Sequence, residues 1–188
     1  MSCAESPVVL VLASGRGERF LASGGAMHKL QAPLGGRPVL ERTLDAVRES
    51  GLPWHVEDAG HPGMGDSIAA AVRATAHAPG WMILPADLPM VRPDTLKAVA
   101  AGLLRGRAAV QPVFDGARGH PVGFGAVCRQ ALLALAGPQG AAAVLRAQRA
   151  AGVAIDVAVA DPGILLDIDT LDDLARAEAA WQARARGG

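Results

Sequence analysis

The sequence predicts an α/β fold in which a three-layer, mostly parallel sheet carries helices on both faces. Short apolar runs alternate with segments of helical periodicity, in the order strand, helix, strand, helix, strand, helix. The first run, Val8–Leu12, is continuously apolar, which is typical of a central parallel strand buried on both sides. The 188 residues are enough for one domain with a substantial core, so we expect a single domain over residues 1–188.

The first half of the chain supplies the three strand–helix pairs. The expected strands span 8–12, 54–57 and 81–84, and the expected helices span 39–47, 68–73 and 93–104. No helical pattern begins directly after the glycines that follow the first strand, so we expect a loop there. The helix at 39–47 should end near Gly51, and Asp66 or Ser67 can cap the helix at 68–73. Pro93 suits the first turn of the helix at 93–104.

The second half of the chain is less regular. Strands are expected at 108–114 and 153–159, with a short strand at 164–169 that ends in acidic residues. Proline and glycine interrupt residues 119–125, which predicts an irregular or edge segment. Two alanine-rich helices at 129–136 and 139–151 and a last helix at 171–185 complete the predicted fold.

Composition narrows the class of protein. Lys and Arg number 18 and Asp and Glu number 18, so no overall charge points to nucleic acid or to an anionic membrane. Cys3 and Cys128 lie far apart and form no C-x-x-C pair, which argues against a disulfide framework and a zinc site. The start of the chain lacks the pattern of a signal peptide, and no apolar run is long enough to span a membrane. We therefore expect a cytoplasmic protein with no membrane partner.

The segment after the first strand has the residues of a phosphate-binding loop. Ser14, Gly15 and Gly17 allow a tight turn with outward N–H groups, and Arg16, Arg19 and Lys29 supply positive charge. Neither the P-loop spacing nor the G-x-G-x-x-G of dinucleotide folds is present. The alternative interpretation is an ordinary surface loop after a strand.

Two aspartates are expected at strand ends. Asp87 follows an apolar run between Pro85 and Pro89, and Asp169 follows the run at 164–169. Fixed carboxylates of this kind suit Mg²⁺, which keeps several waters and bridges phosphate oxygens. Each aspartate could instead be a turn residue, and Asp169 could cap the last helix. If the strands are parallel, both carboxylates lie at the ligand-binding edge of the sheet together with the basic loop.

Two further segments carry polar or glycine-rich turns. Residues 63–67 form a second glycine loop before a helix, although Asp66 and Ser67 could be caps alone. The five histidines have no common ligand spacing. His120 stands out because the turn at 118–121 is rich in donors, with satisfaction of the loop backbone as the alternative role.

Several of these motifs together resemble the MobA-like nucleotidyltransferases, and among them the molybdenum cofactor cytidylyltransferases. The motifs, in family order, are residues 12–20 with Lys29 and Leu30, residues 63–68, residues 84–89, residues 119–124 and residues 167–174. They extend over nearly the whole chain. The resemblance implies the three-layer Rossmann-like fold of nucleotide-diphospho-sugar transferases.

The resemblance also implies a reaction and a set of roles. A nucleoside monophosphate would pass from a nucleoside triphosphate to the terminal phosphate of molybdopterin, with release of pyrophosphate. Lys29, Arg19 and Asp87 would be catalytic, and Asp87 with Asp169 would hold Mg²⁺. The nucleotide would contact Leu12, Ala13, Ser14, Gly15, Arg16, Gly17, Lys29, Gly63, Gly65, Asp66 and Ser67, and the acceptor would contact Gly119, His120 and Pro121.

The identity of the nucleotide and of the acceptor is less constrained. Gly-Met-Gly at residues 63–65 is similar to an element of the cytidylyl-transferring relatives, so the resemblance favours CTP over GTP. The side chain of Ser14 also leaves less room for a purine than a glycine would. Residues 21–26 are additional small residues compared with close relatives, and the connection before Gly63 is short. Alternatives are a guanylyltransferase, an enzyme for another phosphorylated acceptor, or a noncatalytic module that presents cofactor to a partner. A molybdenum oxidoreductase or its chaperone would be that partner.

The proposed chemistry needs no protein nucleophile. A phosphate monoester is mostly ionised at neutral pH, so it can attack the α-phosphorus in line once it is positioned and its charge is neutralised. A chain that performs this reaction needs cations and metal-binding acids, and the sequence offers both.

Overall fold

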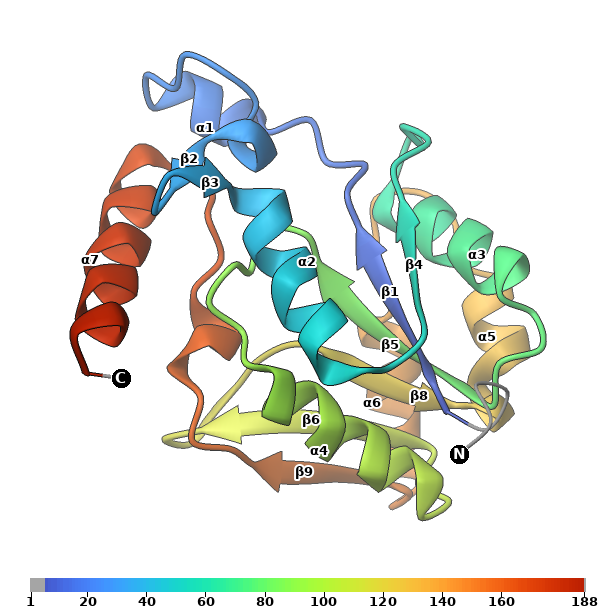
Figure 1. The fold of residues 1–188 in the computed structure, drawn as a ribbon. Helices are drawn as coiled ribbons and strands as arrows, with labels where there is room; N and C mark the ends of the chain where they lie inside the picture. Colours follow the sequence, from blue (N-terminus) through green and yellow to red (C-terminus); the bar gives the residue numbers. More distant parts are fainter. Residues whose placement is uncertain (1–5, 188) are drawn as a thin grey trace.

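The structure, a computed structural model, describes residues 6–187 and contains one large mixed sheet. The strand order in this sheet is β4-β1-β5-β8-β6-β7, with β9 paired to β6 (Figure 1). β1 (Val8–Leu12) runs parallel to both β4 (Trp54–Glu57) and β5 (Gly80–Pro85). The first run of the sequence is therefore the central strand of a parallel trio, as predicted. Cys3 lies outside the described residues.

The other half of the sheet contains antiparallel pairs. β8 (Val122–Gly125) lies between β5 and β6 (Ala109–Phe114) and is antiparallel to both. β9 (Ala154–Ala158) runs parallel to β6, and β7 (Ala117–Arg118) folds back on the end of β6. The sheet is thus mostly parallel on one side and mixed on the other.

The prediction of an irregular or edge segment at 119–125 is confirmed for residues 119–121, which join no ladder, and is wrong for β8, which is an interior strand. Its glycines reflect close packing. A Cβ on Gly123 would lie 2.8 Å from a methyl of Val99, and one on Gly125 would lie 3.0 Å from the carbonyl oxygen of Arg107. The glycines let a helix and a loop approach the strand at distances that a side chain would prevent.

Helices cover both faces of the sheet and make the three predicted layers (Figure 1). Val9 and Val11 of β1 belong to the core cluster shared with α2 and α4, and Leu10 belongs to the cluster shared with α3 and α6. The alternation along one strand shows that both faces of the sheet are buried. The helices are α2 (Val39–Ser50) and α4 (Pro93–Leu104) on one face, α3 (Met64–Ala74), α5 (Arg129–Leu133) and α6 (Ala142–Ala150) on the other, and α7 (Leu171–Gly187) beside the first cluster.

One local expectation was wrong, and several short elements were not predicted. A short helix, α1 (Glu18–Ala22), begins directly after Gly17, where a loop was expected. The two-residue strands β2 (Pro33–Leu34) and β3 (Arg37–Pro38) form a small hairpin that is too short to leave a periodic pattern. The remaining short elements are the 3₁₀ turns η2 (Lys29–Gln31), η3 (Ala126–Cys128) and η4 (Pro162–Leu165).

The short strand predicted at 164–169 is also absent from the described residues. The segment begins in η4 and continues as irregular backbone. The N–H of Ile168 donates to the carbonyl oxygen of Asp87 at 3.0 Å, so the segment binds a turn beyond β5 and joins no sheet ladder. Ile164 and Ile168 are buried in the core, whereas Leu165 is exposed and Leu166 is half-buried, so the apolar run lies at the edge of the core without forming a strand.

Within residues 6–187, no helix combines the length and the apolar character that crossing a bilayer requires.

Candidate functional site

A cavity of about 830 Å³ opens where the parallel strands end. It is lined from the ends of β1 and β5, from the loop after β1, from the start of α3 and from the turn at 118–120. The predicted site residues that line it are Leu12, Ser14, Gly15, Arg16, Gly17, Arg19, Lys29, Gly63, Ser67, Asp87, Gly119, His120 and Asp169. Four others do not line it: Ala13, Gly65, Asp66 and Pro121. The structure therefore gathers most of the predicted residues at the ligand-binding edge of the sheet.

The loop after β1 turns its backbone toward this cavity. Within the described part of the chain, the N–H groups of residues 14–17 donate no hydrogen bond, and Gly17 adopts a left-handed conformation with φ of 65°. The Oγ of Ser14 donates to the carbonyl oxygen of Glu57 at 3.1 Å, which ties the loop to β4. Four amides without partners beside Arg16 can bind an anion.

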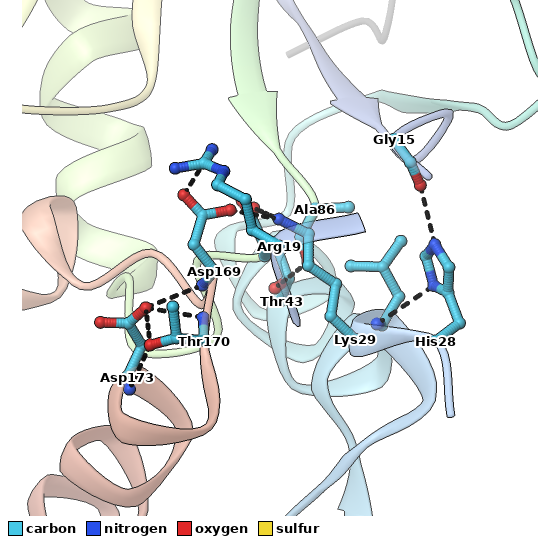
Figure 2. Close-up of polar contacts among 11 residues, drawn as sticks. Gly15, Arg19, His28, Lys29, Thr43, Ala86, Asp169, Thr170 and Asp173 are labelled. Atoms are coloured by element: carbon cyan, nitrogen blue, oxygen red, sulfur yellow. Dashed lines mark hydrogen bonds and ion pairs between the residues drawn. The ribbon is translucent and has the colours of Figure 1, made fainter. Parts of the chain in front are cut away.

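His28 holds the middle of this loop. Its Nε2 lies 2.7 Å from the carbonyl oxygen of Gly15, and its Nδ1 accepts the N–H of Leu30 at 3.3 Å (Figure 2). The two contacts together require a neutral ring with the proton on Nε2. No sequence pattern singles out His28, because its partner lies 13 residues earlier in the chain.

Lys29 joins the two predicted metal-binding aspartates. Its ammonium lies 2.5 Å from Oδ2 of Asp87 and 2.8 Å from Oδ1 of Asp169, with only 12% of the lysine side chain exposed. Burial lowers the pKa of Lys29, but the charges and hydrogen bonds of Asp87 and Asp169 outweigh it, so the pKa is raised overall and the lysine stays charged. Arg19 pairs with the other oxygen of Asp169 at 2.7 Å (Figure 2).

Hydrogen bonds to the backbone of Ala86 and Asp87 hold the turn that carries Asp87. The buried hydroxyl of Thr43 in α2 donates to the carbonyl oxygen of Ala86 at 2.8 Å, and the N–H of Ala86 donates to Leu12 at 3.1 Å. The turn that carries Asp87 is therefore attached to α2 and β1 as well as to Ile168. Residues that are far apart in sequence converge on one ammonium as a result.

Asp169 does not cap the last helix. Thr170 and Asp173 form a reciprocal capping box: the N–H of Thr170 donates to Oδ2 of Asp173 at 2.7 Å, and the N–H of Asp173 donates to Oγ1 of Thr170 at 3.2 Å. The same oxygen of Asp173 accepts the N–H of Asp169 at 3.1 Å. Asp173 thus leaves the carboxylate of Asp169 free to face Lys29 and orients its backbone.

The carboxylates fit a magnesium ion that is held mainly by substrate and water. Oδ1 of Asp87 is buried and has no hydrogen-bond partner among the described residues. No cluster of three or more His, Cys, Asp or Glu with metal-binding geometry occurs in residues 6–187. Mg²⁺ commonly uses only one or two protein carboxylates and completes its shell with phosphates and water. Burial, with the nearby charges of Asp169 and Asp87, raises the pKa of Asp167, which also lines the cavity.

The glycine segment at 63–67 has a packing role that the sequence did not indicate. α3 begins at Met64 after Gly63, so Asp66 and Ser67 lie inside the helix, and the prediction that they cap it was wrong. A Cβ on Gly63 would lie 2.0 Å from the carbonyl oxygen of Gly137, and the carboxylate of Asp66 accepts the N–H of Gly137 at 2.9 Å. The start of α3 is thereby held against residues 136–139, whose Pro138 lines the cavity.

The turn at 118–121 forms the opposite wall. The N–H of His120 donates to the carbonyl oxygen of Ile164 at 3.1 Å, and a Cβ on Gly119 would lie 2.3 Å from that same oxygen. Burial lowers the pKa of His120, although a backbone carbonyl and the charges of Asp87 and Asp167 partly oppose it, so the ring is neutral. Its Nδ1 is buried without a partner among the described residues.

Sequence reasoning missed several residues that organise the site: His28, Thr43, Glu57, Pro138 and Asp173. Only one of them left a readable signal, because Thr170-x-x-Asp173 matches a capping box. The others act through long-range contacts, for which one sequence carries no pattern.

Comparison with known proteins agrees with this geometry. The chain is 32% identical over 126 residues to a protein of Frankia casuarinae named 2-C-methyl-D-erythritol 4-phosphate cytidylyltransferase, a match that covers 55% of this chain and 46% of that protein. The chain spans less than half of the length of the curated relatives it matches.

Solved structures share the fold. A nucleotidyl transferase from Methanothermobacter superposes with a TM-score of 0.78 at 20% identity, covering 95% of this chain and 99% of that one. A molybdopterin-guanine dinucleotide biosynthesis protein A from Archaeoglobus fulgidus gives a TM-score of 0.64 at 20% identity, covering 94% and 99%. A manganese complex of a Mycobacterium tuberculosis protein gives 0.66 at 22% identity, covering 93% and 98%.

A family profile gives the more specific result. Residues 44–152, more than half of the chain, match the MobA-like NTP transferase domain. Together with the loop after β1 and the paired aspartates, this match establishes that the chain belongs to the MobA-like NTP transferase family.

Proposed function

We propose that this protein transfers a nucleoside monophosphate, with CMP favoured, from a nucleoside triphosphate to the terminal phosphate of molybdopterin and releases pyrophosphate. The observation that carries the proposal is the contact of one ammonium, on Lys29, with both Asp87 and Asp169 at the rim of a cavity that also contains the basic loop. This arrangement can neutralise and orient a polyphosphate, and a phosphate-to-phosphate transfer requires little else.

The donor triphosphate would bind along the loop after β1. The N–H groups of residues 14–17 and the side chains of Arg16 and Arg19 would contact its phosphate oxygens, while Lys29 would stabilise the charge that grows on the α-phosphate and on pyrophosphate. Asp87 and Asp169 would hold Mg²⁺, which supplies charge neutralisation at the phosphates when bound. A relative of the same fold that was solved with manganese supports a divalent metal.

The acceptor would lie on the side of Gly119 and His120. An ionised phosphate of the acceptor is itself the nucleophile, so no protein base has to remove a proton. The neutral ring of His120 can bind a polar group of the acceptor without adding charge. Pro121 does not line the cavity, so we assign it the role of shaping this turn.

The preference for CTP rests on the wall opposite this turn. Gly63 and Met64 line the cavity, and the side chain of Ser14 takes up room that a glycine would leave for a purine. A relative named as a cytidylyltransferase supports the same choice. We assign Gly65 and Asp66 to holding this wall in place, since neither lines the cavity.

The direct test is incubation with molybdopterin, Mg²⁺ and each nucleoside triphosphate in turn, followed by mass identification of any dinucleotide. We expect a cytosine dinucleotide and stoichiometric pyrophosphate with CTP, and a loss of product in Asp87→Asn. The variant Asp94→Asn, which alters an exposed aspartate of α4, is the matched control. Equal product from Asp87→Asn would contradict the role given to that carboxylate.

Other phosphorylated acceptors form the second candidate, because the curated relative from Frankia casuarinae is named for a sugar-alcohol phosphate. A panel of phosphate monoesters in the same pyrophosphate assay distinguishes them. Binding of nucleotide without turnover on any acceptor would favour a noncatalytic module. We also propose a cytoplasmic location, action of residues 1–188 as a single domain, and a molybdenum oxidoreductase or its chaperone as recipient of the product.

A further inference from the structure

Arg118 is a cation of the cavity that the proposed donor site does not use. Four lysine and arginine side chains of residues 6–187 line the cavity: Arg16, Arg19, Lys29 and Arg118. The first three belong to the basic loop and its continuation toward Asp169. Arg118 comes from β7, which is separated from β1 in the sheet by β5, β8 and β6. It is therefore the cation of the wall that carries Gly119 and His120.

Arg118 is held in place by a carboxylate that it shares with a second arginine. Its Nε and one terminal nitrogen donate to Oδ2 of Asp156 at 3.0 and 2.8 Å, while Arg149 donates to Oδ1 of Asp156 at 2.5 Å. One negative charge thus faces two positive charges. The cluster keeps a net positive charge beside the cavity, which an anion can compensate.

The same network also fixes the turn next to Arg118. Arg149 donates to the side-chain oxygen of Gln111 at 2.8 Å, and the amide nitrogen of Gln111 donates to the carbonyl oxygen of Gly119 at 3.3 Å. α6, β6 and β9 together hold the backbone that precedes His120. Arg118 is therefore anchored at its base and exposed at its guanidinium, with 55% of its side chain accessible.

An exchange of partners by Arg118 costs little. Exposed ion pairs contribute little to stability, because solvent screens the charges and the side chains lose freedom. A phosphate offers the guanidinium two oxygens in the geometry of a carboxylate and up to twice the charge. Asp156 would keep Arg149 as its partner when Arg118 turns toward the cavity.

We propose that Arg118 binds the phosphate of the acceptor and so selects phosphorylated acceptors. This inference rests on the proposed function, because it assumes that the donor nucleotide uses the other three cations. The ion pair with Asp156 alone would give Arg118 a structural role. The proposal adds a role in binding.

A binding experiment tests the proposal without turnover. In ¹⁵N-labelled protein with the donor side saturated by a nucleoside triphosphate, inorganic phosphate is titrated while the arginine Nε–H signals are followed at slightly acidic pH. The signal lost in Arg118→Gln identifies Arg118. We expect that signal to move in a saturable way as phosphate is added to the nucleotide-saturated protein. If no nucleotide binds, we expect the same movement when phosphate is added alone. A signal that stays fixed throughout the titration overturns the proposal.

Kinetics then separate this role from a general loss of function. With any acceptor that the enzyme uses, Arg118→Gln should raise the KM for the acceptor about 10- to 100-fold, the range for a hydrogen bond to a charged group, and leave the KM for the nucleotide unchanged. Arg118→Lys should recover part of this loss. Arg146→Gln, which removes an exposed charge of α6 that does not line the cavity, is the matched control.

The two proposals fail in different ways. If no acceptor supports pyrophosphate release from the wild-type protein but phosphate still shifts the Arg118 signal, the proposed function is wrong and the anion site stands. If turnover occurs and Arg118→Gln leaves the KM for the acceptor unchanged, Arg118 only stabilises the β6–β7 hairpin and this inference is wrong.

Discussion

The ammonium of Lys29 carries one positive charge, and two carboxylates at the rim of the cavity share it. Asp87 and Asp169 bring two negative charges within hydrogen-bond distance of one nitrogen, so one negative charge is left over. The exposed side chain of Arg19 compensates part of that charge through its ion pair with Asp169. The charges of Asp87 and Asp169 raise the pKa of Lys29 despite the opposing effect of its burial, so the contact persists through the neutral range.

Replacement of Lys29 tests its role in the reaction. We expect Lys29→Met to lower kcat for pyrophosphate release by about 100-fold or more, since a preorganised cation at the transferred phosphate is lost. Lys29→Arg should retain part of the activity, because it keeps the charge with a different shape. Lys97→Met, on the exposed face of α4, is the control. A turnover within about threefold of the wild type in Lys29→Met would contradict the assigned role.

His28 gives a weaker and more selective prediction. Its ring supports the carbonyl of Gly15, so His28→Ala should loosen the loop after β1 without removing a charge. We expect the KM for the nucleotide to rise about 5- to 10-fold, as for loss of one hydrogen bond, with kcat nearly constant. His77→Ala, at an exposed position away from the cavity, should leave both parameters unchanged. A fall in kcat alone would argue against this positioning role.

At the scale of an element, the start of α7 contributes both to stability and to the site, because Asp173 caps the helix and also binds the backbone of Asp169. Asp173 is partly desolvated, which raises its pKa, but hydrogen bonds from Thr170 and from the N–H groups of Asp169 and Thr170, together with Arg176, lower its pKa overall. Its folded pKa thus lies below the unfolded value of about 3.9. The stabilisation is therefore present above that value and is lost as the pH falls through the folded pKa.

Asp173→Ala tests this link. We expect it to lower the free energy of unfolding by about 1 kcal/mol at neutral pH, as for loss of a helix cap. The difference from the wild type should shrink as the pH falls below about 4, because protonation removes the same contacts in the wild type. Urea unfolding at several pH values measures it. A difference that does not depend on pH would show that the carboxylate charge has no part in the cap.

The start of α3 yields a prediction about space. Gly63→Ala should lower the free energy of unfolding by about 1 to 3 kcal/mol, because the new methyl group would meet the backbone of Gly137 and force the helix away from it. Gly15→Ala is the matched control, since a Cβ there would meet nothing within 4 Å and its φ is not positive. Comparable losses in thermal unfolding for both variants would contradict the packing argument.

For the whole molecule, the sequence predicted the parts that depend on local patterns. Val8–Leu12 as a central strand, the helix at 93–104 and the layered α/β class were confirmed, because apolar periodicity records burial directly. The same signal failed at 164–169, where Ile164 and Ile168 are buried although the backbone binds the turn at Asp87 and joins no sheet ladder. It failed again at β8, where glycines that admit α4 resemble the interruptions of an edge strand.

For the candidate site, the sequence predicted which residues lie near the edge of the sheet but not how they contact one another. Asp87 could be placed at the edge of the sheet from the expected direction of its strand, and it lines the cavity. Asp169 also lines the cavity, but it comes from irregular backbone after η4, so the strand on which its placement rested is absent. That Asp66 binds a backbone N–H of Gly137, and that Lys29 lies between the two aspartates, depends on contacts between residues 58 to 140 positions apart. Periodicity contains no information about such pairs.

Metal removal should leave the fold intact. Because Lys29 already compensates Asp87 and Asp169, we expect a chelator to leave the midpoint of thermal unfolding unchanged, and Mg²⁺ together with a nucleoside triphosphate to raise it through binding to the native state. A fall of several degrees on chelation would show that the folded chain depends on an ion that it binds without nucleotide.

The position of the Lys29 side chain also determines how a ligand gains access to the acids. We expect an incoming molecule to offer the ammonium group an anionic substitute before the carboxylates accept another cation. Uncharged nucleosides bring no such substitute, whereas triphosphates do. We therefore expect discrimination between them to start with an exchange of ionic partners at Lys29, before any recognition of the base.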